Sequence, residues 1–499
     1  MRPELQGYLR TALHDDLVGA AIVAVLLIPQ SLAYALLAGL PPQVGLYASL
    51  LPLAAYAALG SSPLLCVGPV AVLALMISQA LAQLPAGVAP QAGALVLAAE
   101  VALLLAAAAW LRLDALASLL SVPVLHGFET GATLSIALSQ LPVLLGAPVR
   151  GSNLPQLAAS WWQARVAWQP MTALYGIGAL LALWAARRYA VRIWARLAPL
   201  LVLVLALIAA ALADAGAHGV TLVGALPELT PRVALPPLDA GLWAQLLPSA
   251  LLIALVAFVS SLVVAESLGR RQGTRVVPRR ELAGLAAANL AAALSSGMPV
   301  AGSFSRSVLA RDAGSRTRMA GVFTAVFMAL AVVLLARPLA ALPATVLAAT
   351  VIVAVLAGLD WRPFGHAWAY SRAEGVLMSA VAALTLLQGV AWALGVGVAA
   401  SIALLLQRTA RPHVALIGRV PGTEHYRNVG RHEVQLTPGV MALRIDESLL
   451  FTNARELVDV VQQQLAAVPD TQRLVLLMSP VNRIDFSGLE ALRALHQTL

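Results

Sequence analysis

Hydrophobic residues form long runs that repeat along the chain from about residue 17 to residue 406, and short stretches rich in Pro, Gly and Arg separate them. Runs such as Ala94–Trp110 and Leu197–Ala213 approach or exceed the roughly 20 apolar residues that a helix needs to cross a bilayer. The pattern predicts an all-α polytopic membrane protein with fourteen spans. We expect these spans to begin near Leu17, Gln43, Pro69, Ala92, Pro123, Met171, Leu197, Leu246, Glu281, Ser303, Met319, Pro343, Gly375 and Leu394.

The third and tenth predicted spans are irregular in the same way. "CVGPVAVLALM" from Cys66 and "GMPVAGSFSRSVLA" from Gly297 both open with Gly, Pro and small residues and then continue for a short helical distance. A division into seven plus seven spans puts them at equivalent positions, which is typical of two half-helices that meet at the midplane of an inverted-repeat transporter. The alternative interpretation is a pair of helix kinks without functional meaning.

The pattern changes after Arg411. "VMALRID", "ARELVDVVQQQLAAV" and "RLVLLMS" predict a strand, an amphipathic helix and a buried strand. We therefore expect a cytoplasmic N-terminal segment over 1–16, a transmembrane domain over 17–411, a linker over 412–438 and a cytoplasmic α/β domain over 439–499. The chain ends inside what reads as the second helix of that domain, so we expect it to be truncated.

The composition supports a membrane protein and excludes several classes of enzyme. Hydrophobic residues make up 60% of the chain, charged residues only 11%, and the mean hydropathy is +0.85. The sequence contains no lysine, so it encodes neither a Walker A ATPase nor a lysine Schiff-base enzyme. With Cys66 as the single cysteine, histidines that lack ligand spacing and no catalytic motif such as GxSxG, we expect no metal, no cofactor and no enzymatic activity.

The formal net charge of +9 comes from arginine, and its distribution predicts an orientation. If both ends are cytoplasmic, the inner loops carry clusters such as Arg187–Arg196 and Arg270–Arg280. Outer loops then contain only Arg150, Arg165, Arg232 and Arg337. This bias follows the positive-inside rule and explains the basic charge better than nucleic-acid binding does.

Three stretches together resemble the sulfate permease (SulP) family of anion transporters. They are "IPQSLAYALLAGLPPQVGLYASLLPLAAYAALGSSPLLCVGP", "GSFSRSVLARDAGSRTRMAG" and "IDFSGLEAL". The resemblance covers essentially the whole chain. It implies seven plus seven inverted repeats divided into core and gate subdomains, a carboxy-terminal STAS domain, and a homodimer. It also implies small anions as substrates, such as sulfate, bicarbonate, chloride, oxalate and dicarboxylates.

The resemblance further implies a substrate site between the first, third, eighth and tenth spans. Carried over by motif, its residues are Gln30, Tyr34, Gly68, Pro69, Val70, Ser303, Phe304, Ser305 and Arg306. The residue types fit an anion, because two half-helix N-termini offer unpaired N–H groups and positive dipole ends. We expect Pro69 in the first turn of one half-helix and Ser303 as the N-cap of the other. Tyr34 and Phe304 would form the walls.

Arg306 has three interpretations, because an arginine near the centre of a span costs about 2.5–3.5 kcal/mol on insertion scales and seldom faces lipid there. It can bind the substrate directly. It can lie behind the cavity and raise the potential without touching the anion. It can also be structural, either paired with a buried carboxylate or reaching the inner interface.

Three carboxylates lie in or near apolar runs: Glu100, Glu129 and Glu266. Each can carry a proton that moves with the substrate, or can pair with an arginine. Family members that resemble proton-coupled transporters have a glutamate in the eighth span, where this chain has Ser260, and this departure weakens the case for coupling of that kind. The span also lacks the aspartate expected of a sodium site. We retain Glu129 beside His126, Glu266 and Ser260 as coupling candidates.

The prediction is a secondary active anion transporter of a bacterial inner membrane that works by alternating access as a proton-coupled symporter. The main alternative is an uncoupled or channel-like pathway or exchanger, and a nucleobase transporter of the same architecture is a third. In "IDFSGLEAL", Ser487 is either a regulatory phosphorylation site, as the resemblance implies, or a helix N-cap.

Overall fold

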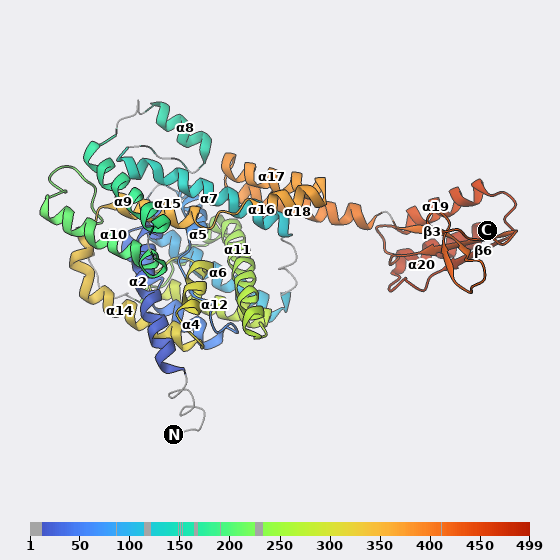
Figure 1. Cartoon of the computed structure of the whole chain (residues 1–499), viewed down its shortest axis with the longest axis horizontal. Coiled ribbons are helices and arrows are strands. Elements are labelled where there is room, and N and C mark those ends of the chain that lie inside the picture. The colour runs from blue at the N-terminus through green and yellow to red at the C-terminus, as the bar shows by residue number, and fades with distance from the viewer. Residues whose placement is uncertain are drawn as a thin grey trace, which may run out of the picture. The chain divides into compact units, whose positions relative to one another are not determined.

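The computed structural model describes residues 12–85, 87–113, 121–147, 149, 151, 153–163, 168–189, 191–224, 233–410 and 412–499. The first eleven residues of the expected N-terminal segment, residue 411, Arg150, Arg165 and Arg232 lie outside the described residues. The chain divides into two compact units, Met1–Val398 and Ala399–Leu499. Figure 1 shows that the first is a bundle of helices, whereas the second contains a sheet.

Helices dominate the first unit. Its elements follow one another as α2 (Leu13–Leu37), α3 (Pro42–Tyr47), α4 (Leu51–Leu59), β1 (Val67–Gly68), α5 (Ala71–Leu81), α6 (Pro90–Trp110), α7 (Val122–Leu145), α8 (Leu154–Gln163), α9 (Pro170–Tyr189), α10 (Arg192–Leu212), α11 (Ala240–Gln272), α12 (Pro278–Leu294), β2 (Ala301–Gly302), α13 (Phe304–Asp312), α14 (Met319–Ala340), α15 (Ala344–Leu356), α16 (Arg362–Tyr370), α17 (Arg372–Leu387) and α18 (Val390–Thr409), which continues into the second unit.

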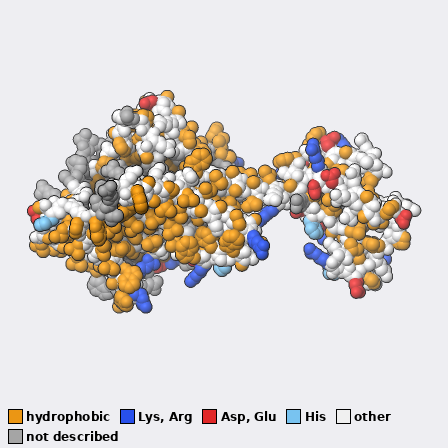
Figure 2. Space-filling model, turned by 90° about the horizontal axis from the view of Figure 1, so that it is seen from above, with side chains coloured by type: hydrophobic (Ala, Val, Ile, Leu, Met, Phe, Trp, Pro, Cys, Tyr) orange, Lys and Arg blue, Asp and Glu red, His pale blue; other side chains and the backbone are white. Residues whose placement is uncertain are grey.

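A helix lies within a few residues of each predicted span start, and the short helices α8 and α16 were not expected. Six spans in the described part of the chain are long and apolar enough to cross a membrane: Leu13–Leu37, Pro42–Leu59, Pro90–Trp110, Val122–Leu145, Ala240–Arg270 and Val390–Thr409. Shorter apolar helices, α5 and α15 among them, lie between these. Figure 2 shows hydrophobic side chains over most of the visible face of this unit, as a protein surrounded by lipid requires.

Contacts between the helices of the first unit occur in matched pairs. α6 packs against α12 as α14 packs against α4, and α6 packs against α11 as α14 packs against α2. Likewise α5 contacts α11 as α13 contacts α2, and α7 contacts α17 as α15 contacts α9. In each of these pairs, the second contact is obtained from the first when both helices are replaced by the helices seven predicted spans away in the chain. Several contacts depart from this pairing. α2 packs against α15 while the corresponding helices α11 and α7 touch far less, and α7 packs against α9 while α15 and α17 touch far less.

The second unit is a four-stranded sheet with two helices. Its strand order is β4 (Tyr426–Asn428), β3 (Val414–Arg419), β5 (Val440–Ile445) and β6 (Arg473–Leu477). β3 runs antiparallel to β4 and β5, whereas β5 and β6 are parallel and are joined through α19 (Ala454–Ala467). The two strands and the helix predicted after residue 439 are confirmed. The expectation that the second strand is buried is wrong, because β6 lies at the edge of the sheet and its residues are exposed or partly exposed. β3 and β4 lie in the segment that we expected to be a linker.

The core of the second unit lies between the sheet and its helices. Met441, Leu443 and Ile445 alternate along β5 and are buried together with Leu457 of α19 and Leu495 of α20 (Phe486–Thr498). Because α19 and α20 also contact each other, both helices cover the same face of β5. This period-two burial is what the sequence "VMALRID" predicted.

The N-cap of α20 is Asp485, so the expectation that Ser487 caps this helix is wrong. Asp485 Oδ1 accepts from the Gly488 N–H at 2.9 Å, and Oδ2 accepts from the Phe451 N–H at 2.7 Å. These N–H donors stabilise the carboxylate and hold the pKa of Asp485 below its usual range. Asp485 has the cap because it is in extended backbone directly before the helix, whereas Ser487 is already inside it.

We expect Asp485→Ala to loosen the start of α20 and the loop at Phe451, because two backbone N–H groups lose their acceptor. Hydrogen–deuterium exchange on the full chain should show faster exchange in peptides that cover residues 449–453 and 486–492. Ser487→Ala is the matched control and should exchange like the parent chain. Equal protection in both variants would contradict the assignment of the cap.

Candidate functional site

The two irregular spans meet through a short antiparallel pair of strands. Val67 pairs with Gly302 and Gly68 with Ala301, and the Ser303 N–H continues the pairing by donating to the Cys66 carbonyl at 3.0 Å. α5 leaves one end of this pair and α13 leaves the other, so two helix N-termini lie within a few residues of each other. The prediction of two short helices that begin at a common point is confirmed.

Side chains from neighbouring helices satisfy the extended backbone around this pair. Ser261 Oγ of α11 accepts from the Gly302 N–H at 2.8 Å, and Ser307 Oγ of α13 accepts from the Cys66 N–H at 2.9 Å. The Asn289 amide of α12 binds both polar groups of Val300, accepting from its N–H at 2.9 Å and donating to its carbonyl at 3.1 Å. Sequence reasoning missed all three, although a single amide in "AANLAAAL" is a signal that could have identified Asn289.

Arg306 lies inside this junction with a side chain that is only 1% exposed. Its Nη1 donates to the Pro69 carbonyl at 2.8 Å and to Gln30 Oε1 at 3.3 Å. Its Nε and Nη2 are buried without a hydrogen-bond partner, and no carboxylate of the described residues pairs with it. The structural interpretation of Arg306, as an ion pair or a side chain reaching the interface, is therefore wrong for this conformation.

Gly68 gives the guanidinium its room. A Cβ at this position would lie 3.3 Å from Nη2 of Arg306, which is closer than ordinary van der Waals contact. Pro69 stands before the helix and not in its first turn as expected, because α5 begins at Ala71 with Val70 as its N-cap residue. The position of Pro69 leaves its carbonyl free to accept from Arg306.

The remaining predicted site residues divide into buried and exposed groups. Gln30 and Tyr34 are buried on α2, one turn apart. Ser303 is the N-cap residue of α13 by position, but its side chain makes no cap hydrogen bond, and its Oγ lies 3.3 Å from Ser305 Oγ. Phe304 is 58% exposed and Ser305 is exposed, so these two side chains reach the surface of the chain at the start of α13.

The coupling candidates have different surroundings. Glu129 lies 3.6 Å from His126, and Glu266 lies 3.7 Å from Arg270 one turn later, both half exposed. The pairing with an arginine that we considered for each glutamate is thus confirmed for Glu266 and wrong for Glu129, whose partner is a histidine. Ser260 Oγ donates to the Val256 carbonyl at 2.6 Å within α11. Glu100 is buried, and its Oε2 has no hydrogen-bond partner.

Two further buried carboxylates anchor the chain on either side of the junction. Asp16 accepts from the N–H groups of Arg316 at 2.7 Å and Thr317 at 3.1 Å, which fixes the loop after α13. Glu281 of α12 accepts from Tyr56 Oη at 2.7 Å and from the N–H groups of Ser61 and Ser62 at 2.9 Å, which fixes the segment before β1. Both side chains are fully buried, so a saturated carboxylate holds the segment before β1 and another holds the loop after α13.

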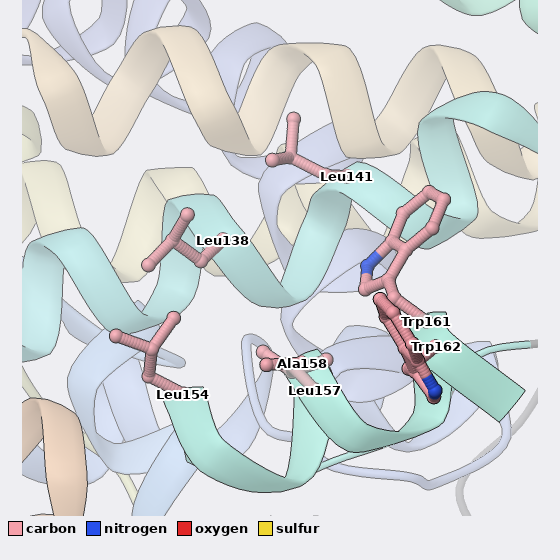
Figure 3. A pocket seen from close by; sticks show the side chains of 7 residues that line it. All are labelled: Leu138, Leu141, Leu154, Leu157, Ala158, Trp161 and Trp162. Carbon is pink, nitrogen blue, oxygen red and sulfur yellow. The ribbon is translucent and has the colours of Figure 1, made fainter. Parts of the chain in front are cut away.

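Two surface hollows of the first unit lie away from the junction. A hollow of about 830 Å³ between α7 and α8 is lined by Leu138, Leu141, Leu154, Leu157, Ala158, Trp161 and Trp162 (Figure 3). It is apolar, and its tryptophans suit the boundary between lipid and water. Another hollow, of about 370 Å³, is lined partly by the amides of Gln79, Gln83, Asn153, Gln156 and Gln388. Its described lining residues include no charged side chain.

Comparison with known proteins decides the family. The model of the sulfate permease family matches residues 13–381, and the STAS domain model matches residues 431–499. The chain belongs to the sulfate permease family. It is 34% identical to a protein named "Probable sulfate transporter" of Mycobacterium tuberculosis, over 99% of this chain and 89% of that protein. It is 31% identical to the chloroplastic sulfate transporter 4.1 of Arabidopsis thaliana, over 97% of this chain and 73% of that protein.

Solved structures share the fold of this sulfate permease family member. The murine Solute Carrier 26 family member A9 anion transporter in the inward-facing state superposes with a TM-score of 0.87 at 21% identity, over 98% of this chain and 84% of that one. The transmembrane domain of the cyanobacterial bicarbonate transporter BicA superposes with a TM-score of 0.66, also at 21% identity, over 78% of this chain and 97% of that one. The chain is therefore a multi-pass membrane anion transporter with a STAS domain, and not an enzyme.

We expect Asn289→Leu to destabilise the first unit, because it leaves the Val300 N–H and carbonyl without partners. Each buried group left unpaired costs about 1–3 kcal/mol. The midpoint of thermal unfolding in detergent should fall clearly. Leu290→Ala, at a neighbouring position that is 48% exposed, should change it little. Equal midpoints for the two variants would show that Asn289 does not support the junction.

Proposed function

We propose that this chain is a secondary active transporter of small anions that works by alternating access as a proton-coupled symporter. The observation that carries the proposal is Arg306, a buried positive charge with two unpaired nitrogens between the entries to α5 and α13. A buried cation that lacks a carboxylate partner favours an anion nearby. The N-termini of α5 and α13 add positive dipole ends in the same place.

The proposed site follows from this arrangement. Backbone N–H groups at the start of the two half-helices and the hydroxyls of Ser303 and Ser305 are the first donors to the anion. Gln30, Tyr34, Gly68, Pro69 and Val70 form one side, whereas Ser303, Phe304, Ser305 and Arg306 form the other. Nη1 of Arg306 already donates to the Pro69 carbonyl and to Gln30. Nε and Nη2 therefore either contact the anion directly or stabilise it through the positive charge without touching it.

The proposed architecture has fourteen spans in two inverted repeats of seven, with core and gate subdomains. The matched contacts support it, because each contact maps onto its partner by a shift of seven predicted spans, and an odd number of spans reverses the second repeat in the membrane. We also propose a transport domain over 17–411, a linker over 412–438 and a STAS domain over 439–499. The protein would be a homodimer in a bacterial inner membrane with both termini cytoplasmic.

The proposed substrate class is sulfate, bicarbonate or a dicarboxylate. Relatives named as sulfate transporters and a structural neighbour named as a bicarbonate transporter support this range. Backbone N–H groups, hydroxyls and one guanidinium suit each of these anions, because all present oxygen acceptors with negative charge.

Candidates for proton coupling lie on two helices, α7 and α11. Glu129 beside His126 on α7 and Glu266 on α11 are ionisable, whereas Ser260 stands where a carboxylate would support coupling of the family type. The Ser260 hydroxyl bonds its own helix and cannot carry a proton through the cycle. This observation favours the alternative, an uncoupled exchanger or channel-like pathway.

Ser305→Glu should abolish anion uptake into proteoliposomes, because it places a negative charge at the start of α13 beside the proposed anion. In Ser305→Gln the new side chain has nearly the same size as glutamate but no charge, so this variant should retain a substantial share of the uptake. Folding and assembly of both variants are checked by size-exclusion chromatography. Normal uptake by Ser305→Glu would refute the site.

Flux measurements separate the symporter from its alternative. An imposed pH gradient, alkaline inside, should drive uphill accumulation of the transported anion, identified beforehand by a competition series of radiolabelled anions. Anion current that is insensitive to the proton gradient would instead establish the uncoupled pathway.

A further inference from the structure

Glu100 is a buried carboxyl group in the middle of α6 that the proposed site does not use. Its side chain is 3% exposed, and its Oε2 is buried without a hydrogen-bond partner. Since this oxygen lacks a donor that would stabilise a negative charge, its surroundings favour the neutral acid.

Charged residues on the elements packed against α6 lie at or near the ends of those elements. α6 contacts α5, α11 and α12 and itself carries no other charged residue. α5 has none, and those of α11 are Asp239 at its N-cap and Glu266, Arg270 and Arg271 in its last two turns. Those of α12 are Arg279, Arg280 and Glu281 in its first turn. Arg279 donates to the Ala109 carbonyl, nine residues from Glu100 or about 13 Å along the helix.

The other acidic side chains discussed above differ from Glu100 in having partners. Asp16 and Glu281 are saturated by backbone and hydroxyl donors, and a proton on either would break that network. Glu129 and Glu266 are half exposed and lie near a histidine and an arginine. Of these five, Glu100 is the one with a buried carboxylate oxygen that makes no hydrogen bond.

The position of α6 connects this carboxyl to the anion site. α6 packs against α5, whose N-terminus opens the proposed site, and against α11, whose Ser261 holds β2 through the Gly302 N–H. A charge that appears at Glu100 acts on both helices in a medium of low dielectric constant, where it is poorly screened. Movement of these helices that admits water would provide the route for the proton.

We propose that Glu100 is the proton-binding residue of the transport cycle, an inference that rests on the proposed proton-coupled symport. The carboxylate binds one proton when the site opens to the outside and becomes the carboxylic acid. The acid returns the proton to water when the site opens to the cytoplasm. In between, the neutral form crosses with the anion, which lowers the charge that the core must carry.

The test uses the full chain in proteoliposomes with radiolabelled sulfate, or radiolabelled bicarbonate if sulfate is not taken up. Glu100→Gln fixes the neutral form. We expect it to equilibrate the anion down its gradient but to lose the accumulation that an inside-alkaline pH gradient drives in the parent chain. Its uptake should also lose its dependence on pH. Glu129→Gln and Glu266→Gln are measured in parallel.

The outcomes are distinct. Accumulation and a pH profile like those of the parent chain in Glu100→Gln would make Glu100 a structural acid and overturn the inference, and loss confined to Glu129→Gln or Glu266→Gln would do the same. A parent chain that never accumulates anion against a gradient would overturn the proposed symport as well. If Glu100→Gln does not fold, Glu100→Asp is measured instead. A proton-binding role for Glu100 predicts that this variant still accumulates the anion but with a shifted dependence of uptake on pH. An unchanged pH dependence would reject the role.

Discussion

The transport unit depends on the burial of one arginine, Arg306, which pairs with no carboxylate in the described part of the chain. Arg306 is held by a backbone carbonyl and a neutral amide, so its positive charge is positioned but not neutralised. The surrounding sequence serves this arrangement: Gly68 makes room for the guanidinium, and Pro69, standing before α5, presents its carbonyl. A carboxylate in the same place would neutralise the charge and remove the attraction for a substrate anion.

Extended backbone in the interior of a membrane protein requires partners for every N–H and carbonyl. The two strands meet this requirement partly by pairing with each other and partly through Ser261, Ser307 and Asn289. The saturated carboxylates of Asp16 and Glu281 then fix the chain further out. Polar side chains in the apolar runs thus have a structural purpose, and their hydrogen bonds hold two half-helices at one point.

The pattern of the sequence was enough to predict most of the helices, the two short entries, and the strands β5 and β6 of the second unit. It did not predict the short helices α8 and α16 or the strands β3 and β4. Each predicted element depends on local composition: apolar length for helices, Gly and Pro for the entries, and alternation for β5. The resemblance to sulfate permeases brought the site residues together. What could not be predicted were contacts that depend on tertiary geometry, such as the partners of Arg306, the role of Glu281 and the choice of Asp485 over Ser487 as a cap. A single polar residue gives no periodic signal in the sequence. Only its contacts in the folded structure show whether its side chain has a structural or a functional role.

The matched helix contacts have a consequence for the energetics of the transport cycle. In the proposed architecture of two inverted repeats, an exchange of packing between the repeats would give a conformation with many of the same kinds of contact, close in free energy to the present one. Contacts without a counterpart, such as that between α2 and α15, then distinguish the present conformation, and the corresponding contact between α11 and α7 would form in the other. Near-equal energies allow a small input, such as a bound anion or a proton, to shift the populations by a large factor, since about 1.4 kcal/mol changes an equilibrium tenfold.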